Sequence, residues 1–256
     1  YDGAAPELVQ MIPLGAPAYI KAAEFMVVYN NKIYCAGSQN SQLAWSAELS
    51  AGAVLGTIPD FPSANVINPG GVSDGDSIMG LAVAYGHLII FKRNAIYALS
   101  DSSGSPSITQ IGRSVGLVCK HSWCNAENSV WFFGPSGTYS IGSDLTPQFE
   151  SDFVLPDYQD MMKDLVTDFE SYSAITVPSI NHPVYAYNQT KQQVWVSGFI
   201  GAIATPARNI VYIHDMINKD SSGRAAVSNY VFYQSAIRNY TPVLFCESID
   251  ETTNEP

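Results

Sequence analysis

Carboxylates are scattered along this chain, and two facing carboxylates are what glycoside hydrolysis requires. Six acidic residues lie in strand-like or turn-like surroundings: Asp74, Asp76, Asp144, Glu150, Asp152 and Glu170. Nothing in their spacing pairs any two of them. A sialidase-type Ser-x-Asp-x-Gly-x-x-Trp box is also missing, because the nearest segment, DSSGSPSIT at 101–109, has no matching tryptophan. These residue types therefore give no support for a glycosidase.

Candidate metal ligands are equally sparse. Asp74-Gly75-Asp76 lacks the further spaced oxygen ligands of a recognised calcium loop, so we interpret it as a turn. His121 shares a predicted strand face with Cys119, but a zinc site usually has four ligands. Cys119 and Cys124 are five residues apart, which would place them on opposite faces of a regular strand. We expect free buried thiols and neither a metal site nor a cofactor.

The remaining catalytic signals are absent. The four histidines, His87, His121, His182 and His214, lie in unrelated contexts. No Gly-x-Ser-x-Gly elbow, phosphate-binding loop or His-Glu-x-x-His motif occurs. The sequence predicts that the protein is not an enzyme and has no catalytic or cofactor-binding residues.

Composition limits the possible partners. The chain has 256 residues, of which 46% are apolar and 14% charged, with a formal net charge of −11. Tight binding to nucleic acid needs clustered Lys and Arg, whereas an acidic surface suits DNA that passes without sticking. No run approaches the ~20 apolar residues of a membrane span. The opening residues, YDGAAPELVQ, lack the basic and apolar regions of a signal peptide, so we expect none.

One pattern recurs three times and predicts the architecture. The copies are MVVYNNKIYCAG (26–37), LIIFKRNAIYALS (88–100) and VWFFGPSGTYSIG (130–142). In each, a strand-like apolar run leads into a turn-like segment, and a tyrosine follows the last large apolar residue by six positions: Tyr34, Tyr97 and Tyr139. Each copy is expected to be the central hairpin of one antiparallel blade, with its tyrosine at a blade-to-blade interface.

These spacings predict an all-β fold, a β-propeller of about four to five blades of short antiparallel strands. We expect a single propeller domain over residues 1–250, followed by a polar tail at 251–256. The blade-like units are about 12–50, 77–116, 117–153, 171–218 and 228–250. Residues 56–76, rich in Pro, Gly, Asn and Asp, are expected to form an inserted loop.

One segment has helical periodicity. Apolar residues of 156–169 recur at the spacing of an amphipathic helix, and we expect one inserted helix there. Asp160, Asp164 and Asp168 would line its opposite side. An ordinary solvated face and a docking surface for a basic partner are both compatible with this acidic row.

The block from Ile67 to Ser100, followed by ITQIGRSVG and SVWFFGPSGTYSIG, resembles the β-propeller region of tail nozzle, tail tubular protein B and tail-stabilisation proteins of short-tailed phages. The motifs are the strand Gly75–Leu81, the hairpin end Ile96–Leu99, the corner at Gly116 and the turn Gly137–Tyr139. Trp45-Ser46 and the helix have counterparts at similar places. The resemblance covers roughly residues 12–170 and defines no catalytic residues.

The resemblance implies a structural protein of a phage virion, in a homo-oligomeric ring that forms part of the conduit for DNA ejection. The implied partners are other tail or portal-adaptor proteins. The alternative is a carbohydrate-binding or depolymerising module at a host surface, using aromatics such as Trp45, Trp123 or Trp195, although core packing also explains each of these residues. A peptide-binding scaffold is disfavoured, since WD and kelch signatures are missing.

Overall fold

The structure is a computed structural model of the whole chain. It describes residues 23–37, 41–48, 61–71, 74–101, 105–120, 122–127, 129–151, 183–200, 208–219 and 225–233. Within these ranges the protein is all-β and contains no helix. The predicted helix at 156–169 lies outside the described residues.

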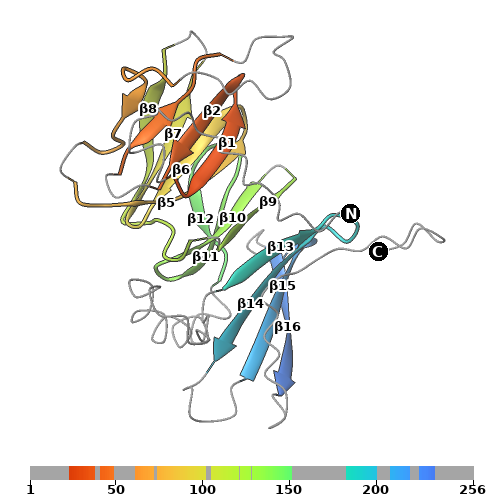
Figure 1. Cartoon of the computed structure of the whole chain (residues 1–256). Helices are drawn as coiled ribbons and strands as arrows, with labels where there is room; N and C mark the ends of the chain where they lie inside the picture. Colours follow the sequence, from red (N-terminus) through yellow and green to blue (C-terminus); the bar gives the residue numbers. More distant parts are fainter. Residues whose placement is uncertain are drawn as a thin grey trace, which may run out of the picture.

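The described residues form sixteen strands in four antiparallel sheets of four strands each, and in each of these sheets the strand order follows the chain (Figure 1). Sheet A comprises Phe25–Tyr29 (β1), Lys32–Ala36 (β2), Leu43–Trp45 (β3) and Val66–Ile67 (β4). Sheet B comprises Ile78–Ala84 (β5), His87–Lys92 (β6), Ala95–Ser100 (β7) and Ser107–Arg113 (β8). Sheet C comprises Trp123–Ala126 (β9), Ser129–Gly134 (β10), Gly137–Ile141 (β11) and Pro147–Phe149 (β12). Sheet D comprises Val184–Asn188 (β13), Gln193–Ile200 (β14), Arg208–Lys219 (β15) and Ala225–Tyr233 (β16).

The three sequence copies are hairpins with one shared register. Tyr34 pairs with Val27, Tyr97 with Ile90 and Tyr139 with Phe132. The position of the hairpin in its sheet differs from the prediction. It is central in sheets B and C, but in sheet A it consists of β1 and β2 and so lies at one edge. The tyrosine pattern thus records hairpin register and not the place of the hairpin in a blade.

Successive apolar residues in β6 reflect burial of sheet B on both faces. Side chains alternate between the two faces of a strand. Leu88 and Ile90 pack in a cluster with sheet A, whereas Ile89 and Phe91 pack in a cluster with sheet C. All four are fully buried. A run of four apolar residues is therefore what a strand between two sheets requires.

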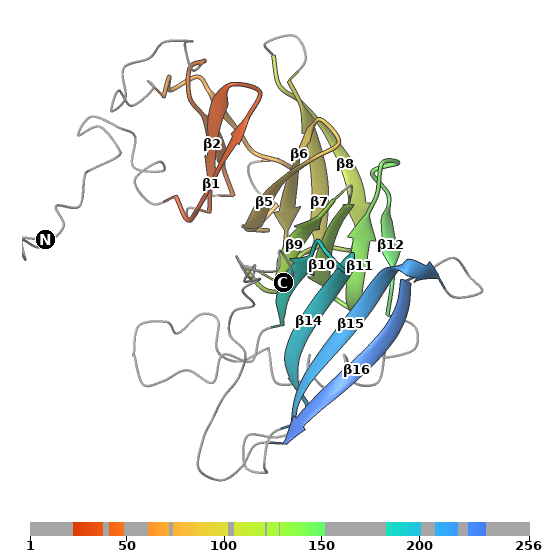
Figure 2. The same ribbon diagram turned by 90° about the vertical axis from the view of Figure 1, so that its right-hand side faces the viewer.

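The same packing continues through the molecule, so that the sheets stack in the order A, B, C, D (Figures 1 and 2). Tyr34 and Tyr97 share the interface between sheets A and B, and Tyr139 lies in the interface between B and C. The interface between C and D contains Trp131, Phe133 and Tyr212. The marker tyrosines therefore all lie between sheets, but two of them share one interface, so they do not take one equivalent place in each interface.

The sheets converge at their first strands. Flat sheets stacked face to face are separated by about 10 Å, which would leave sheets A and C about 20 Å apart. However, Nζ of Lys120, just before sheet C, lies 2.5 Å from Oε2 of Glu24, just before sheet A. The segments that lead into sheets A and C therefore come together on this side. The first strands of neighbouring sheets also contact each other, β1 with β5 and β9 with β13, which agrees with this convergence.

At two of the predicted unit boundaries, the described strands pair across the expected limit. The segment expected to be an inserted loop, 56–76, contains β4, which completes sheet A by pairing with β3. The segment expected to begin a fifth unit, 228–250, begins within β16, which pairs along β15 as the last strand of sheet D. In both cases the partner strand is not signalled by a tight hairpin turn, so local sequence does not reveal the pairing. Residues 234–256 lie outside the described part.

Candidate functional site

A buried ion pair ties sheet A to sheet B. Lys32 follows the two-residue turn Asn30–Asn31, whose positive φ values of 46° and 57° suit a tight hairpin. Nζ of Lys32 donates to Oδ2 of Asp101, just after β7, at 2.7 Å, and the Tyr34 hydroxyl donates to the same oxygen at 3.0 Å. Burial and the Asp101 carboxylate raise the pKa of Tyr34. This cluster fastens the hairpin end of sheet A to its neighbour.

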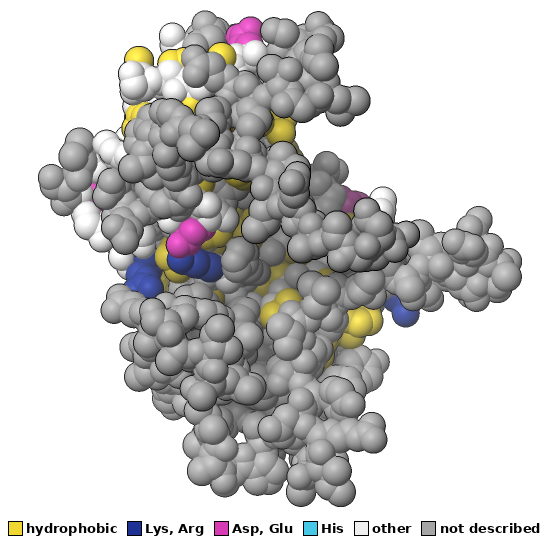
Figure 3. Space-filling view, viewed as in Figure 1, with side chains coloured by type: hydrophobic (Ala, Val, Ile, Leu, Met, Phe, Trp, Pro, Cys, Tyr) yellow, Lys and Arg dark blue, Asp and Glu magenta, His cyan; other side chains and the backbone are white. Residues whose placement is uncertain are grey.

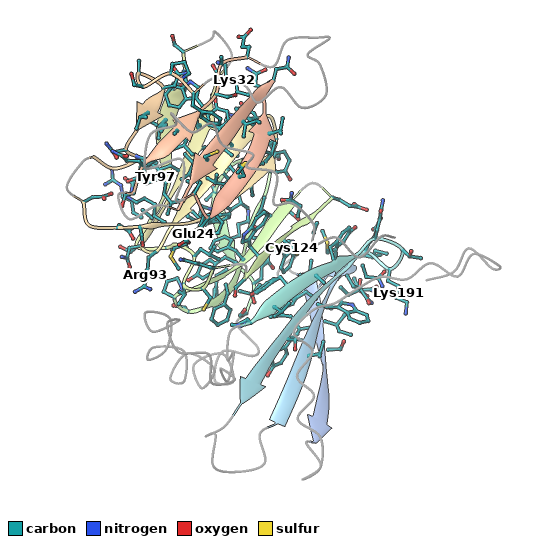
Figure 4. The ribbon with its side chains drawn as sticks, in the orientation of Figure 1. Glu24, Lys32, Arg93, Tyr97, Cys124 and Lys191 are labelled. Atoms are coloured by element: carbon teal, nitrogen blue, oxygen red, sulfur yellow. The ribbon has the colours of Figure 1, made fainter. Side chains whose placement is uncertain are left out.

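The opposite end of sheet A is fastened by a salt bridge between Lys120 and Glu24, of which Figure 4 labels Glu24. Their side chains are 46% and 32% exposed, so this pair is far more solvated than Lys32 and Asp101. In Figure 3 an acidic patch lies directly against a basic one on this side of the molecule. Sheet A is thus held at both ends by salt bridges to residues distant in sequence.

The Asp74-Gly75-Asp76 segment is held by protein donors. The Asp74 carboxylate pairs with Lys92, whose buried Nζ also donates to the Pro69 carbonyl at 2.8 Å. The Asp76 carboxylate accepts the backbone N–H groups of Arg93 and Asn94, each at 3.0 Å. These contacts fix the segment against the turn between β6 and β7, where it orders the backbone.

The other candidate carboxylates have separate local partners. Oδ1 of Asp144 accepts the Thr146 N–H, and Oε1 of Glu150 accepts the Ser140 hydroxyl at 2.7 Å. The structure therefore gives these two carboxylates different hydrogen-bonding surroundings. Asp152 and Glu170 lie outside the described residues. Among the residues that are described, no group of three His, Cys, Asp or Glu side chains is arranged to hold a metal ion.

Two of the three candidate tryptophans pack in the core. Trp45 is 9% exposed and lies between sheets A and B, and Trp123 packs against Phe91 between sheets B and C. Trp195 is half-buried on the face of sheet D that points away from sheet C, and its Nε1 donates to Oε1 of Gln193 at 3.3 Å. Of the three, Trp195 is the one that lies outside the interfaces between the described sheets.

The described histidines have unlike surroundings. Nδ1 of His87 lies 2.8 Å from the Tyr85 carbonyl oxygen. His214 is fully buried, and its ring lies 5.2 Å from that of Trp131, between sheets C and D. Burial lowers the pKa of His214 to about 4. His121 and His182 lie outside the described residues.

Cys35, Cys119 and Cys124 are free thiols. Burial raises the pKa of Cys35 to about 11 and that of Cys124 to about 12. The Cys119 pKa is also raised to about 12, chiefly by burial. Cys119 precedes β9 instead of lying in it, so the prediction of opposite strand faces is wrong, and both it and Cys124 pack between sheets C and D. Such thiols are poor nucleophiles at neutral pH.

One face of sheet A is apolar. The pairing of β1 to β4 places six residues on the side of sheet A that points away from sheet B: Met26, Val28, Ile33, Cys35, Ala44 and Val66. We call this set the outer face of sheet A. Met26 and Val28 are 52% and 59% exposed, whereas Cys35 and Ala44 are buried. Antiparallel sheets that face water usually carry polar residues on that side, so this face has the composition of an interface.

Comparison with known proteins does not assign this chain to a family. No protein-family model matches the chain, and no curated protein matches it. In the described part of the chain, the structure has no helix of the length and apolar character that a membrane crossing demands.

Proposed function

We propose that this protein is a structural component of a bacteriophage tail, of the nozzle, tail-tube or hub type, and forms part of a ring-shaped conduit for DNA ejection. The observation that carries the proposal is the repeated, converging stack of four-stranded sheets, of which sheets A to C span the residues of the tail-protein motifs. The motif strand Gly75–Leu81 runs into β5, and the hairpin end Ile96–Leu99 lies in β7.

The contacts of the motif glycines support a packing role. A Cβ at Gly116 would overlap the backbone carbonyl oxygens of Lys92 and Arg93, so the corner needs glycine for close approach. A Cβ at Gly134, in the third sequence copy, would overlap the ring of Tyr139. These residues allow neighbouring segments to pack tightly, which is a property of a rigid building block.

The net charge of the chain and the pairing of its described lysines support the role of a conduit more than that of an enzyme. The described lysine–carboxylate pairs join sheets or brace turns. The net charge of −11 would repel the phosphate backbone, which suits DNA that has to pass. A blade stack completed by neighbouring chains would give such a ring its walls.

Cryo-EM of the particle that contains this chain is the test. The proposal expects density for the sheet stack in a ring around the axial channel of a tail, and no measurable binding of the isolated chain to double-stranded DNA at about 0.15 M salt. Density only in outward-facing peripheral knobs, or tight DNA binding, would contradict it.

A host-surface carbohydrate module is the second candidate, and the position of Trp195 favours it. The half-buried indole beside the Gln193 amide combines an apolar platform with a polar group. Saturable binding to a bacterial glycan that is lost in Trp195→Ala, but kept in Ile217→Ala on the neighbouring strand, would support this function instead.

A further inference from the structure

We propose that the interface between sheets C and D is an acid-sensitive contact, in which protonation of His214 separates sheet D from sheet C while both sheets stay folded. This inference goes beyond the proposed function and does not depend on it. Its basis is the position of His214, which lies on β15 and is fully buried. The centre of its ring lies 5.2 Å from that of Trp131 on β10. A charge on the imidazole would therefore form inside the interface itself.

The surroundings of His214 favour its neutral form. Its register partners in sheet D are Val194 and Val227, and the cluster between the two sheets contains aliphatic, aromatic and sulfur-containing side chains. Burial in such surroundings disfavours the charged imidazolium and lowers the pKa of His214 to about 4. Opening the interface would return the ring to water, where the ordinary pKa is about 6.5. As the pH falls below that value, the open form binds the proton first and gains population.

The other titratable groups around this interface respond differently to acid. The thiols and phenols that share the cluster are those of Cys119, Cys124, Tyr185, Tyr187 and Tyr212. Thiols and phenols stay uncharged as the pH falls below neutral. Two carboxylates adjoin the interface: Glu150 accepts the hydroxyl of Ser140, which pairs beside Trp131, and exposed Glu127 accepts the side-chain amide of Gln192. Acid removes charge from a carboxylate, so among these groups a new charge arises only on the histidine.

Sheet D is joined to its neighbour without ion pairs. Salt bridges tie sheet A to sheet B and to the segment before sheet C, whereas among the described residues none joins sheet D to sheet C. Uncharged hydrogen bonds link the last two sheets, from the Ser122 hydroxyl to the Pro183 carbonyl and between the hydroxyls of Thr138 and Tyr185. The strands β14, β15 and β16 have 8, 12 and 9 residues and pair with one another. Opening the interface therefore leaves the backbone pairing within sheet D in place.

The test is the rate at which Cys119 of the full chain reacts with a dipyridyl disulfide, a reagent that labels thiols in acid as well as at neutral pH. Cys119 is 1% exposed and packs between sheets C and D, so its reaction requires the interface to open. Each rate is divided by that of free glutathione at the same pH, which removes the pH dependence of the thiol chemistry itself. The closed and open pKa values of His214 predict a rise of about 20-fold in this ratio from pH 7 to pH 5. The far-UV circular dichroism should not change over this range.

Three controls separate local opening from general unfolding. Cys35 is the internal control, because it is 3% exposed but lies on the outer face of sheet A, and its ratio should stay nearly constant. His214→Gln carries a neutral amide, so its Cys119 ratio should not depend on pH, whatever its value at pH 7. His87→Gln is the matched control, since His87 lies outside this interface, and it should keep the rise. A constant wild-type ratio at Cys119, an equal rise at Cys35, a rise retained in His214→Gln or a rise lost in His87→Gln would overturn the inference.

Discussion

Burial should decide how much each salt bridge of sheet A contributes to stability. The Lys32 and Asp101 side chains are 7% and 0% exposed, whereas those of Lys120 and Glu24 are 32% and 46% exposed. Removing one partner of a buried pair leaves an uncompensated charge and typically costs 3–5 kcal/mol, that is, about 4 kcal/mol here. An exposed pair typically contributes about 0–1 kcal/mol. The two pairs have the same chemistry and hold the same sheet, so they form a matched comparison.

Asp101→Asn is the most informative change. The amide keeps the shape of the carboxylate, but Lys32 loses its counter-charge, and Oδ1 of Asp101 has no hydrogen-bond partner among the described residues to receive an amide proton. We expect a loss of about 4 kcal/mol in the free energy of unfolding. In the double variant Lys32→Met/Asp101→Leu no buried charge remains, so much of the stability should return.

Urea unfolding followed by circular dichroism measures these losses, and a cycle of Lys32→Met, Asp101→Leu and their double variant gives the coupling between the two residues. Glu24→Gln in the exposed pair should cost at most about 1 kcal/mol. A loss for Asp101→Asn no larger than that for Glu24→Gln would refute the argument from burial. So would a double variant whose loss in the free energy of unfolding equals the sum of the two single losses.

Three further changes test the packing. Gly116→Ala should destabilise the fold by about 1–3 kcal/mol or more, because the new methyl group overlaps the Lys92 and Arg93 carbonyl groups, while Gly142→Ala, which meets only Asp144 at 3.6 Å, should change the melting temperature little. Tyr97→Ala should cost about 3–5 kcal/mol in urea unfolding, as for other buried aromatic residues, and an unchanged melting temperature would argue against its place between sheets A and B. The folded-state pKa of His214, about 4, lies below the ordinary 6.5, so the unfolded chain binds the proton first as pH falls. Stability should therefore be lost between about pH 6.5 and 4, by about 3 kcal/mol, and His214→Gln should lack this part of the loss. Parallel stability curves for wild type and His214→Gln over that range would contradict the assignment.

The hairpins were accessible from sequence because their pairing is local. The run before each turn and the tyrosine after it lie within a dozen residues of each other, and the turn sets the register in which they meet. The apolar runs in β6 and β10 were also readable from sequence, since a strand covered on both faces needs no polar position. The all-β class followed from these two features.

Tertiary structure decided the rest, because it depends on partners that are far apart in the chain. Val66–Ile67 becomes a strand only because β3 lies beside it, and β16 joins sheet D because β15 offers an edge of matching length. The contact of Lys120 with Glu24 joins residues 96 positions apart and exists because the sheets converge. Which face of sheet A packs against sheet B likewise cannot be read from the sequence of β1, where both faces are apolar. Alternation predicts two faces, and only the position of sheet B determines which of them is covered.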